Sequence, residues 1–150
     1  MNIKRFITTS CLSLCITAAL ALTTFSVSAE QMKKLGNWNV HYMALGSTFL
    51  TPDIAKAYEI ERSSYSGLIN ISVLSNKKGN VAQRVVISGE ARNLLGQAVD
   101  LKFKEIVEGN AVYYIAQIDY RNEETYNFDI KLKQDGETQS FKFSQKFYVN

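Results

Sequence analysis

The sequence predicts an all-β domain, an immunoglobulin-like two-sheet antiparallel sandwich of about seven strands with one short helix between the first and second strands. Three observations predict it: period-two alternation of apolar and polar residues, Gly- and Asn-rich turns between the alternating segments, and a length of about 120 residues after an apparent leader. A closed β-barrel would show the same periodicity and is the alternative.

The clearest strand is predicted over residues 125–133, where aromatic and aliphatic residues alternate with Asn, Asp and Lys. Residues 99–104 and 141–147 alternate in the same way. Successive side chains of a strand point to opposite faces, so this period is typical of strands with one face in the core and one in water.

Four further strands are predicted from apolar runs over residues 38–45, 68–74, 81–91 and 111–120. The last of these runs is apolar on both phases near its start, as in a central strand covered on both sides. Turn compositions rich in Gly and Asn separate the runs, so short antiparallel hairpins are the expected connections.

One charged residue, Glu105, falls on the inward phase after Phe103. Either the carboxylate is buried with partners, or a β-bulge shifts the register so that Ile106 resumes the core. The bulge is the favoured interpretation.

Residues 1–29 are predicted to be a cleaved secretory signal. A charged stub precedes an uncharged apolar stretch over residues 6–22, and Val27-Ser28-Ala29 places small side chains where a signal peptidase reads. The apolar stretch is short and interrupted by Thr and Ser, so no integral membrane anchor is expected. We therefore expect residues 30–150 to form a single β-sandwich domain in the periplasm.

Both cysteines, Cys11 and Cys15, lie within the predicted leader, so the exported domain would have no disulfide and would depend on its apolar core. Removing Lys4 and Arg5 leaves 15 basic and 14 acidic side chains, a net charge of about +1. A charge this small does not favour nucleic acid as a partner.

The residue inventory argues against an enzyme, and no catalytic residue, cofactor or metal site is predicted. The lone histidine, His41, is expected on the polar face of the first strand as a surface imidazole, and without cysteine no thiolate site can form. Ser75 and Lys78 have the Ser-x-x-Lys spacing of penicillin-binding enzymes, but they lie in a predicted turn without the partner motifs.

Residues 46–66 interrupt the strand pattern. Thr51 as N-cap, Pro52 at the first helical position and Asp53 near the positive helix end predict a helix from Pro52 to about Tyr58. Its apolar side is expected to consist of Ile54, Ala57 and Tyr58.

So long an excursion is unusual in a compact sandwich, and loops often carry function. The predicted binding residues are therefore Thr48, Phe49, Tyr58, Arg62 and Tyr65. Arginine and tyrosine together can bind a carboxylate, a phosphate or a sugar.

Four strings of residues together resemble a known family. They are Trp38-Asn39-Val40-His41-Tyr42, Gly46-Ser47-Thr48-Phe49-Leu50-Thr51-Pro52, Asn93-Leu94-Leu95-Gly96-Gln97 and Lys142-Phe143-Ser144-Gln145-Lys146-Phe147-Tyr148. The chain thereby resembles an uncharacterised bacterial secreted family, domain-of-unknown-function family number 4426. The resemblance spans the predicted mature chain and implies export and a single domain, but it implies no catalytic residue, cofactor or partner.

The resulting prediction is a periplasmic, non-enzymatic binding or protein-interaction domain. Its partner could be an envelope protein, a glycan or a lipid headgroup. Lysines on several strand faces could form a basic patch, or could simply keep the sheets soluble. An unrecognised envelope hydrolase and a small outer-membrane β-barrel are the alternative functions, and the sequence does not indicate an oligomeric state.

Overall fold

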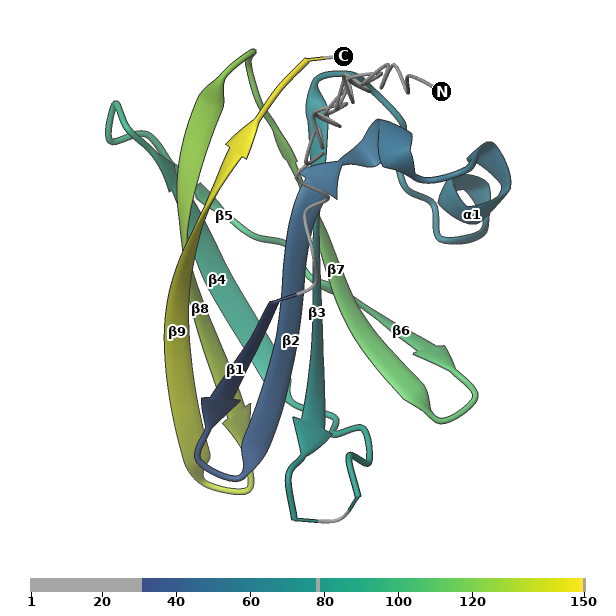
Figure 1. Cartoon of the computed structure of the whole chain (residues 1–150), viewed down its shortest axis with the longest axis vertical. Coiled ribbons are helices and arrows are strands. Elements are labelled where there is room, and N and C mark those ends of the chain that lie inside the picture. The colour runs from purple at the N-terminus through teal and green to yellow at the C-terminus, as the bar shows by residue number, and fades with distance from the viewer. Residues whose placement is uncertain (1–30, 78, 150) are drawn as a thin grey trace, which may run out of the picture.

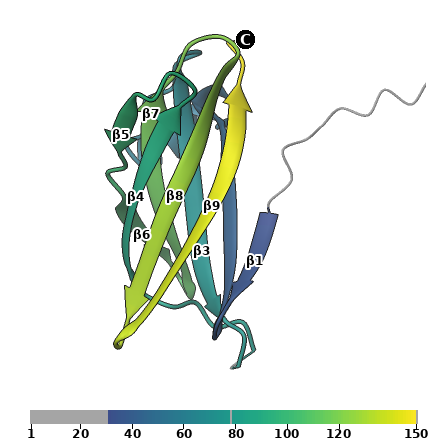
Figure 2. The same ribbon diagram turned by 90° about the vertical axis from the view of Figure 1, so that its left-hand side faces the viewer.

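The computed structural model describes residues 31–77 and 79–149, so the predicted leader lies outside the described residues. Two antiparallel sheets face each other, and a short helix lies beside one of them (Figures 1 and 2). In spatial order, the first sheet contains β1 (Gln31–Leu35), β2 (Trp38–Gly46), β3 (Ser66–Ser75), β7 (Ala111–Asp119) and β6 (Lys104–Glu108). The second contains β5 (Ala98–Asp100), β4 (Val86–Asn93), β8 (Glu124–Gln134) and β9 (Glu137–Phe147).

The predicted all-β, two-sheet sandwich is confirmed. Each sheet ends in two edge strands, β1 and β6 in one and β5 and β9 in the other, so the closed-barrel alternative is wrong for the described residues. A short 3₁₀ turn, η1 (Ser47–Phe49), and the helix α1 (Pro52–Ala57) separate β2 from β3, where the helix was predicted.

The core lies between the sheets and is formed by alternate side chains of the central strands. Phe128 of β8 is fully buried, and its ring stacks on Phe143 with centroids 4.6 Å apart. Tyr42 of β2 reaches across from the other sheet, with its ring 4.7 Å from Phe143 and 5.1 Å from Phe141. These aromatic side chains join the two layers without a covalent crosslink.

The described residues contain nine strands rather than the predicted seven, because β1 was not predicted and one predicted strand is two. The predicted strand over residues 99–104 crosses from one sheet to the other: β5 pairs with β4, and β6 pairs with β7. Leu101 and Phe103, in the crossing, still contribute to the same core. The alternation of inward and outward side chains therefore continues through the crossing. For this reason the periodicity could not reveal that the chain changes sheets.

The predicted strand over residues 81–91 is also shorter than expected, since β4 begins at Val86. The preceding residues run beside β3 instead, through a single bridge between Leu74 and Ala82 and a 2.7 Å hydrogen bond from Gln83 N to Val73 O. The apolar side chains of this segment contribute to the core, although the segment forms no continuous ladder of hydrogen bonds with a neighbouring strand.

The predicted bulge at Glu105 is wrong. Glu105 pairs in regular register with Tyr114, and its carboxylate accepts hydrogen bonds from Arg84 Nη2 at 2.5 Å and Tyr114 Oη at 3.1 Å. The hydrogen bond from Arg84 is the main cause that lowers the pKa of Glu105, against a smaller opposing effect of burial. The charge is tolerated on the inward phase because it is paired at an edge strand.

Candidate functional site

The excursion, residues 46–66, leaves the end of β2, folds over the outer face of the five-stranded sheet and returns at the start of β3 (Figure 1). As predicted, Thr51 caps α1, and its Oγ1 accepts a hydrogen bond from Ile54 N at 3.4 Å. The predicted apolar side is partly wrong, since Ala55 is buried while Ile54 and Ala57 are exposed. A helix of six residues is too short for periodicity to decide which side faces the sheet.

A second, smaller core attaches the excursion to the sheet. Ala55 and Ile60 of the excursion pack with Leu68 of β3, whose side chain lies on the outer face. The half-buried residues around them are Leu45, Leu50, Tyr58 and Ile115. Burial of this apolar area holds the helix against β2, β3 and β7.

Hydrogen bonds at Ser47 close the base of the excursion. Its hydroxyl is fully buried, accepts from Ser63 N at 2.9 Å and donates to Ser63 O at 3.2 Å. Arg62 adds a second connection, donating through Nε to Leu50 O at 2.8 Å and through Nη2 to Thr48 O at 3.2 Å. The two ends of the excursion are therefore tied together by side chains.

Two residues of the sheet fix the other side of the excursion. Gln117 Nε2 donates to Glu61 O at 2.9 Å, and Gln117 Oε1 accepts from Glu61 N at 3.1 Å. Lys104 donates to the carbonyl of Tyr58 at 3.3 Å and forms an ion pair with Glu59. The hydrogen bond and positive charge of Lys104 lower the pKa of the Glu59 carboxyl.

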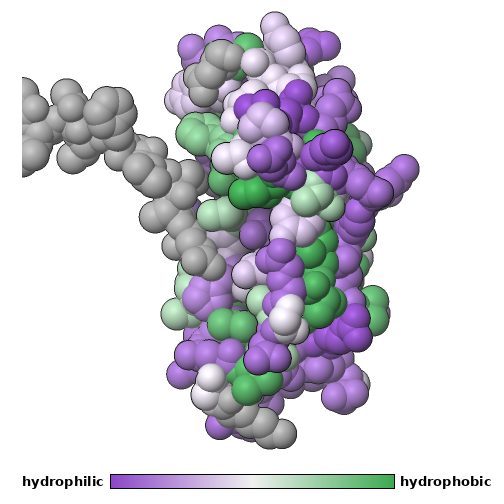
Figure 3. Space-filling view, turned by 90° about the vertical axis from the view of Figure 1, so that its right-hand side faces the viewer, coloured by the Kyte–Doolittle hydropathy of each residue, from purple (hydrophilic) through white to green (hydrophobic). Residues whose placement is uncertain are grey.

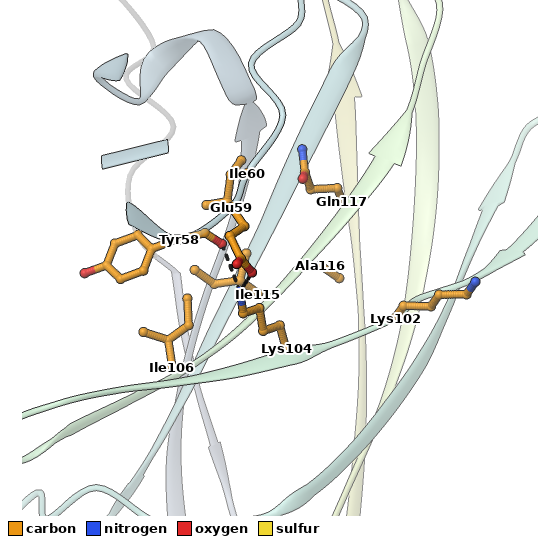
Figure 4. Close-up of a pocket in the computed structure, with 9 residues that line it drawn as sticks. All are labelled: Tyr58, Glu59, Ile60, Lys102, Lys104, Ile106, Ile115, Ala116 and Gln117. Atoms are coloured by element: carbon orange, nitrogen blue, oxygen red, sulfur yellow. Dashed lines mark hydrogen bonds and ion pairs between the residues drawn. The ribbon is translucent and has the colours of Figure 1, made fainter. Parts of the chain in front are cut away.

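Beneath the excursion lies an open cavity of about 200 Å³. Figure 4 shows Ile106 and Ile115 on the side of the sheet and Ile60 on the side of the excursion, with Lys104 turned toward Glu59 and Lys102 extending away from them. Ligand pockets for drug-sized molecules are usually about 300–1,000 Å³, so this cavity suits one side chain of a partner better than a whole metabolite.

The structure places the predicted binding residues in three different environments. Phe49 and Tyr65 are more than half exposed at one end of the sandwich. Thr48 and Arg62 meet through the Arg62 hydrogen bond, and Tyr58 lines the cavity and donates to Glu108. Arg62 thus already has a structural role, and the exposed aromatic rings are the residues of this set that are most available to a partner.

The same end of the sandwich carries three exposed apolar residues that were not predicted. Leu94 and Leu95 form the turn between β4 and β5, 75% and 83% exposed, and Tyr148 follows β9. We call Phe49, Tyr65, Leu94, Leu95 and Tyr148 the end surface. Two adjacent leucines in a Gly-containing turn were a signal in the sequence, because a tight turn gives such side chains little to pack against.

The turn that bears the two leucines is held rigidly by Asn93, which is buried. Its Oδ1 accepts from Leu95 N at 3.1 Å and Gln97 N at 2.9 Å, and its Nδ2 donates to Glu124 Oε1 at 2.8 Å. Burial alone would raise the pKa of Glu124, but hydrogen bonds from Arg121 N and Asn93 outweigh it and lower that pKa. The leucines are therefore displayed on a preorganised loop.

Comparison with known proteins identifies the family of this chain. The family model described as Domain of unknown function (DUF4426) matches residues 32–150. The chain belongs to the DUF4426 family. The crystal structure of a DUF4426 family protein from Pseudomonas aeruginosa PAO1 is 33% identical, with a TM-score of 0.71, over 81% of this chain and 96% of that one. No curated protein matches the chain.

Two more distant structures share the fold of this DUF4426 chain. A copper-bound variant of FetP from uropathogenic Escherichia coli is 11% identical with a TM-score of 0.57, over 81% of this chain and 97% of that one. FetP expressed recombinantly in the periplasm of E. coli is 14% identical with a TM-score of 0.51, over 81% and 94% of the two chains. At these identities the likeness shows the fold alone.

Figure 3 looks onto the side of this DUF4426 domain that carries α1, where hydrophobic patches alternate with hydrophilic ones.

Within residues 31–77 and 79–149, no three side chains of His, Cys, Asp or Glu are grouped so that they could hold a metal ion. In the same part of the chain, none of the helices has the length and apolar character to cross a membrane. The strand lysines that could form a basic patch are Lys102, Lys104, Lys131, Lys133, Lys142 and Lys146. Of these, Lys104 pairs with Glu59, and Lys142 and Lys146 form ion pairs with Asp129 and Glu123 at 2.7 and 3.0 Å.

Proposed function

We propose that this DUF4426 protein is an exported, non-enzymatic domain that binds a partner in the periplasm through its end surface. One observation carries the proposal: five large apolar side chains, each more than half exposed, lie at one end of the sandwich on connecting loops and at the end of β9. Exposed apolar residues that are scattered singly are ordinary, whereas five at one end of a small domain, two of them adjacent leucines in one turn, indicate an interaction site.

The rigidity of the loops supports this function. The excursion that carries Phe49 and Tyr65 is closed by the Ser47–Ser63 hydrogen bonds, and the turn that carries Leu94 and Leu95 is held by Asn93. A preorganised loop loses less conformational entropy on binding than a flexible one, so more of the interaction energy appears as affinity.

An envelope protein is the class of partner that suits these side chains best. Leucine and phenylalanine have no hydrogen-bonding groups for a glycan or a lipid headgroup, whereas their burial against an apolar protein surface is favourable. The tyrosines could add hydrogen bonds at the rim of such an interface. Export is supported by the leader-like first 29 residues.

Capture of partners from envelope extracts by the tagged protein tests the proposal. The double variants Phe49→Ser with Tyr65→Ser, and Leu94→Ser with Leu95→Ser, are each expected to reduce capture at least tenfold without lowering the melting temperature. Removing two interface anchors costs about 1.4 kcal/mol or more, which corresponds to this factor.

The matched control is Val86→Ser with Val107→Ser, which removes two exposed apolar residues away from the end surface. The control should capture the partner as well as the unchanged protein does. Equal capture by all three double variants would show that the end surface is not the binding surface.

A further inference from the structure

The methionine and histidine side chains of the part of the chain that the structure describes gather in one place. After Met1 the sequence contains two methionines, Met32 and Met43, and a single histidine, His41. Met32 in β1 lies directly opposite His41 in β2. Met43 follows His41 by two residues, so the two side chains project from the same face of β2.

This shared face is the outer one, because Val40 and Tyr42, which alternate with His41 and Met43, are buried in the core. Directly opposed residues of an antiparallel pair have Cβ atoms about 4.5–5.5 Å apart. Residues two apart in one strand are about 7 Å apart. Long, unbranched methionine side chains on both sides of an imidazole can therefore reach a common point above the sheet.

The site is open to solvent, and the residues that line the hollow beside it carry no acidic or basic side chain other than His41. Met32 is 53% exposed, and His41 and Met43 are partly exposed. His41 and Met43 also line a hollow of about 200 Å³ together with Asn70, Ser72 and Tyr113, none of which is a basic residue. Nothing in this lining would repel a cation, and the site can be reached from solvent.

Asn70 adds a separate observation. It lies opposite Met43, and its Oδ1 is buried without a hydrogen-bond partner among the described residues. A buried acceptor of this kind costs about 1–3 kcal/mol if it stays unpaired. A donor in the hollow, such as a water bound beside a metal ion, would satisfy it.

We propose that Met32, His41 and Met43 form a binding site for a soft monovalent metal ion, Cu(I). Thioethers are soft, neutral ligands that favour Cu(I), and imidazole also suits copper, whereas magnesium and calcium require oxygen ligands. Three neutral donors leave the full positive charge on the ion, which favours a monovalent ion over Zn(II). Ligation takes one ring nitrogen of His41 and leaves the other for a hydrogen bond.

The prediction of no metal site rested on counting histidines and cysteines, and that count overlooks thioethers. The site also differs from the end surface, since it lies on the outer face of β1 and β2 rather than on the loops. Metal binding and partner binding can therefore succeed or fail separately.

The test is anaerobic titration of the purified protein, with a C-terminal tag free of histidine, against Cu(I) held by the absorbing chelator bicinchoninate. We expect one Cu(I) per chain. Met32→Leu, Met43→Leu and His41→Gln should each weaken binding at least tenfold, and leucine preserves the volume of methionine, so the fold should persist. Ser88→Ala, at an exposed position of β4 in the other sheet, is the control and should bind Cu(I) unchanged.

Methyl NMR with Ag(I), a redox-inert ion of the same soft class, gives a second readout. The methyl signals of Met32 and Met43, assigned from the two leucine variants, should both shift and saturate at one equivalent. Stationary methyl signals would overturn the proposal. Metal binding that the leucine variants do not weaken would overturn it too, because it would show an isolated surface imidazole.

Discussion

Replacing Phe128 with alanine is expected to lower the free energy of unfolding by about 3–5 kcal/mol. The side chain is fully buried, stacks on Phe143 at 4.6 Å and has the rings of Tyr126 and Phe147 within 6.3 and 6.5 Å. A domain of this size is stable by only about 5–15 kcal/mol, so the loss would be a large share of the total. Urea unfolding followed by circular dichroism measures it.

Phe49→Ala is the matched control, because the same atoms are removed from a ring that is 72% exposed. Its free energy of unfolding should stay within about 0.5 kcal/mol of the unchanged protein. A loss below 1 kcal/mol for Phe128→Ala would mean that burial of this ring in the core between the sheets does not hold this disulfide-free domain together.

Replacing Ser47 with alanine is expected to loosen the excursion. The substitution leaves Ser63 N without the hydroxyl oxygen that now accepts its hydrogen bond, while Ser63 O keeps a 3.1 Å hydrogen bond from Ser66 N. A donor left unpaired away from water costs about 1–3 kcal/mol. The cost should fall mainly on residues 47–65, so amide hydrogen exchange there should accelerate about tenfold or more while the central strands keep their protection.

Ser88→Ala provides the comparison, since it removes the same hydroxyl from an exposed position of β4. Exchange over residues 47–65 should be unchanged in that variant. If Ser47→Ala also leaves exchange unchanged in this segment, the Ser47–Ser63 hydrogen bonds do not hold the excursion in place.

Much of the fold could be predicted because alternation reports directly on which residues face the core. Residues 125–133 show it, since every predicted inward position from Tyr126 to Leu132 is buried. The crossing at Leu101 and Phe103 could not be predicted in this way, because a chain that passes between two sheets keeps the same inward phase. The short strand β1 was missed because its exposed pattern resembles that of a loop.

The candidate site was predicted less completely. The excursion and its helix followed from Thr51 and Pro52, whose roles are local. The structural use of Arg62 depends on the carbonyls of Thr48 and Leu50, which only the folded chain brings to it. The end surface unites residues far apart in sequence, such as Tyr65 and Leu95, and no local pattern could group them.

Site-specific photo-crosslinking in living cells tests the proposed binding at the end surface most directly. A photoreactive amino acid is placed at position 65 in the excursion, at position 95 in the β4–β5 turn, or at position 131 on the outer face of β8. The account predicts that positions 65 and 95 capture the same protein, while position 131 captures none. Equal capture from position 131, or no capture from positions 65 and 95, would contradict it.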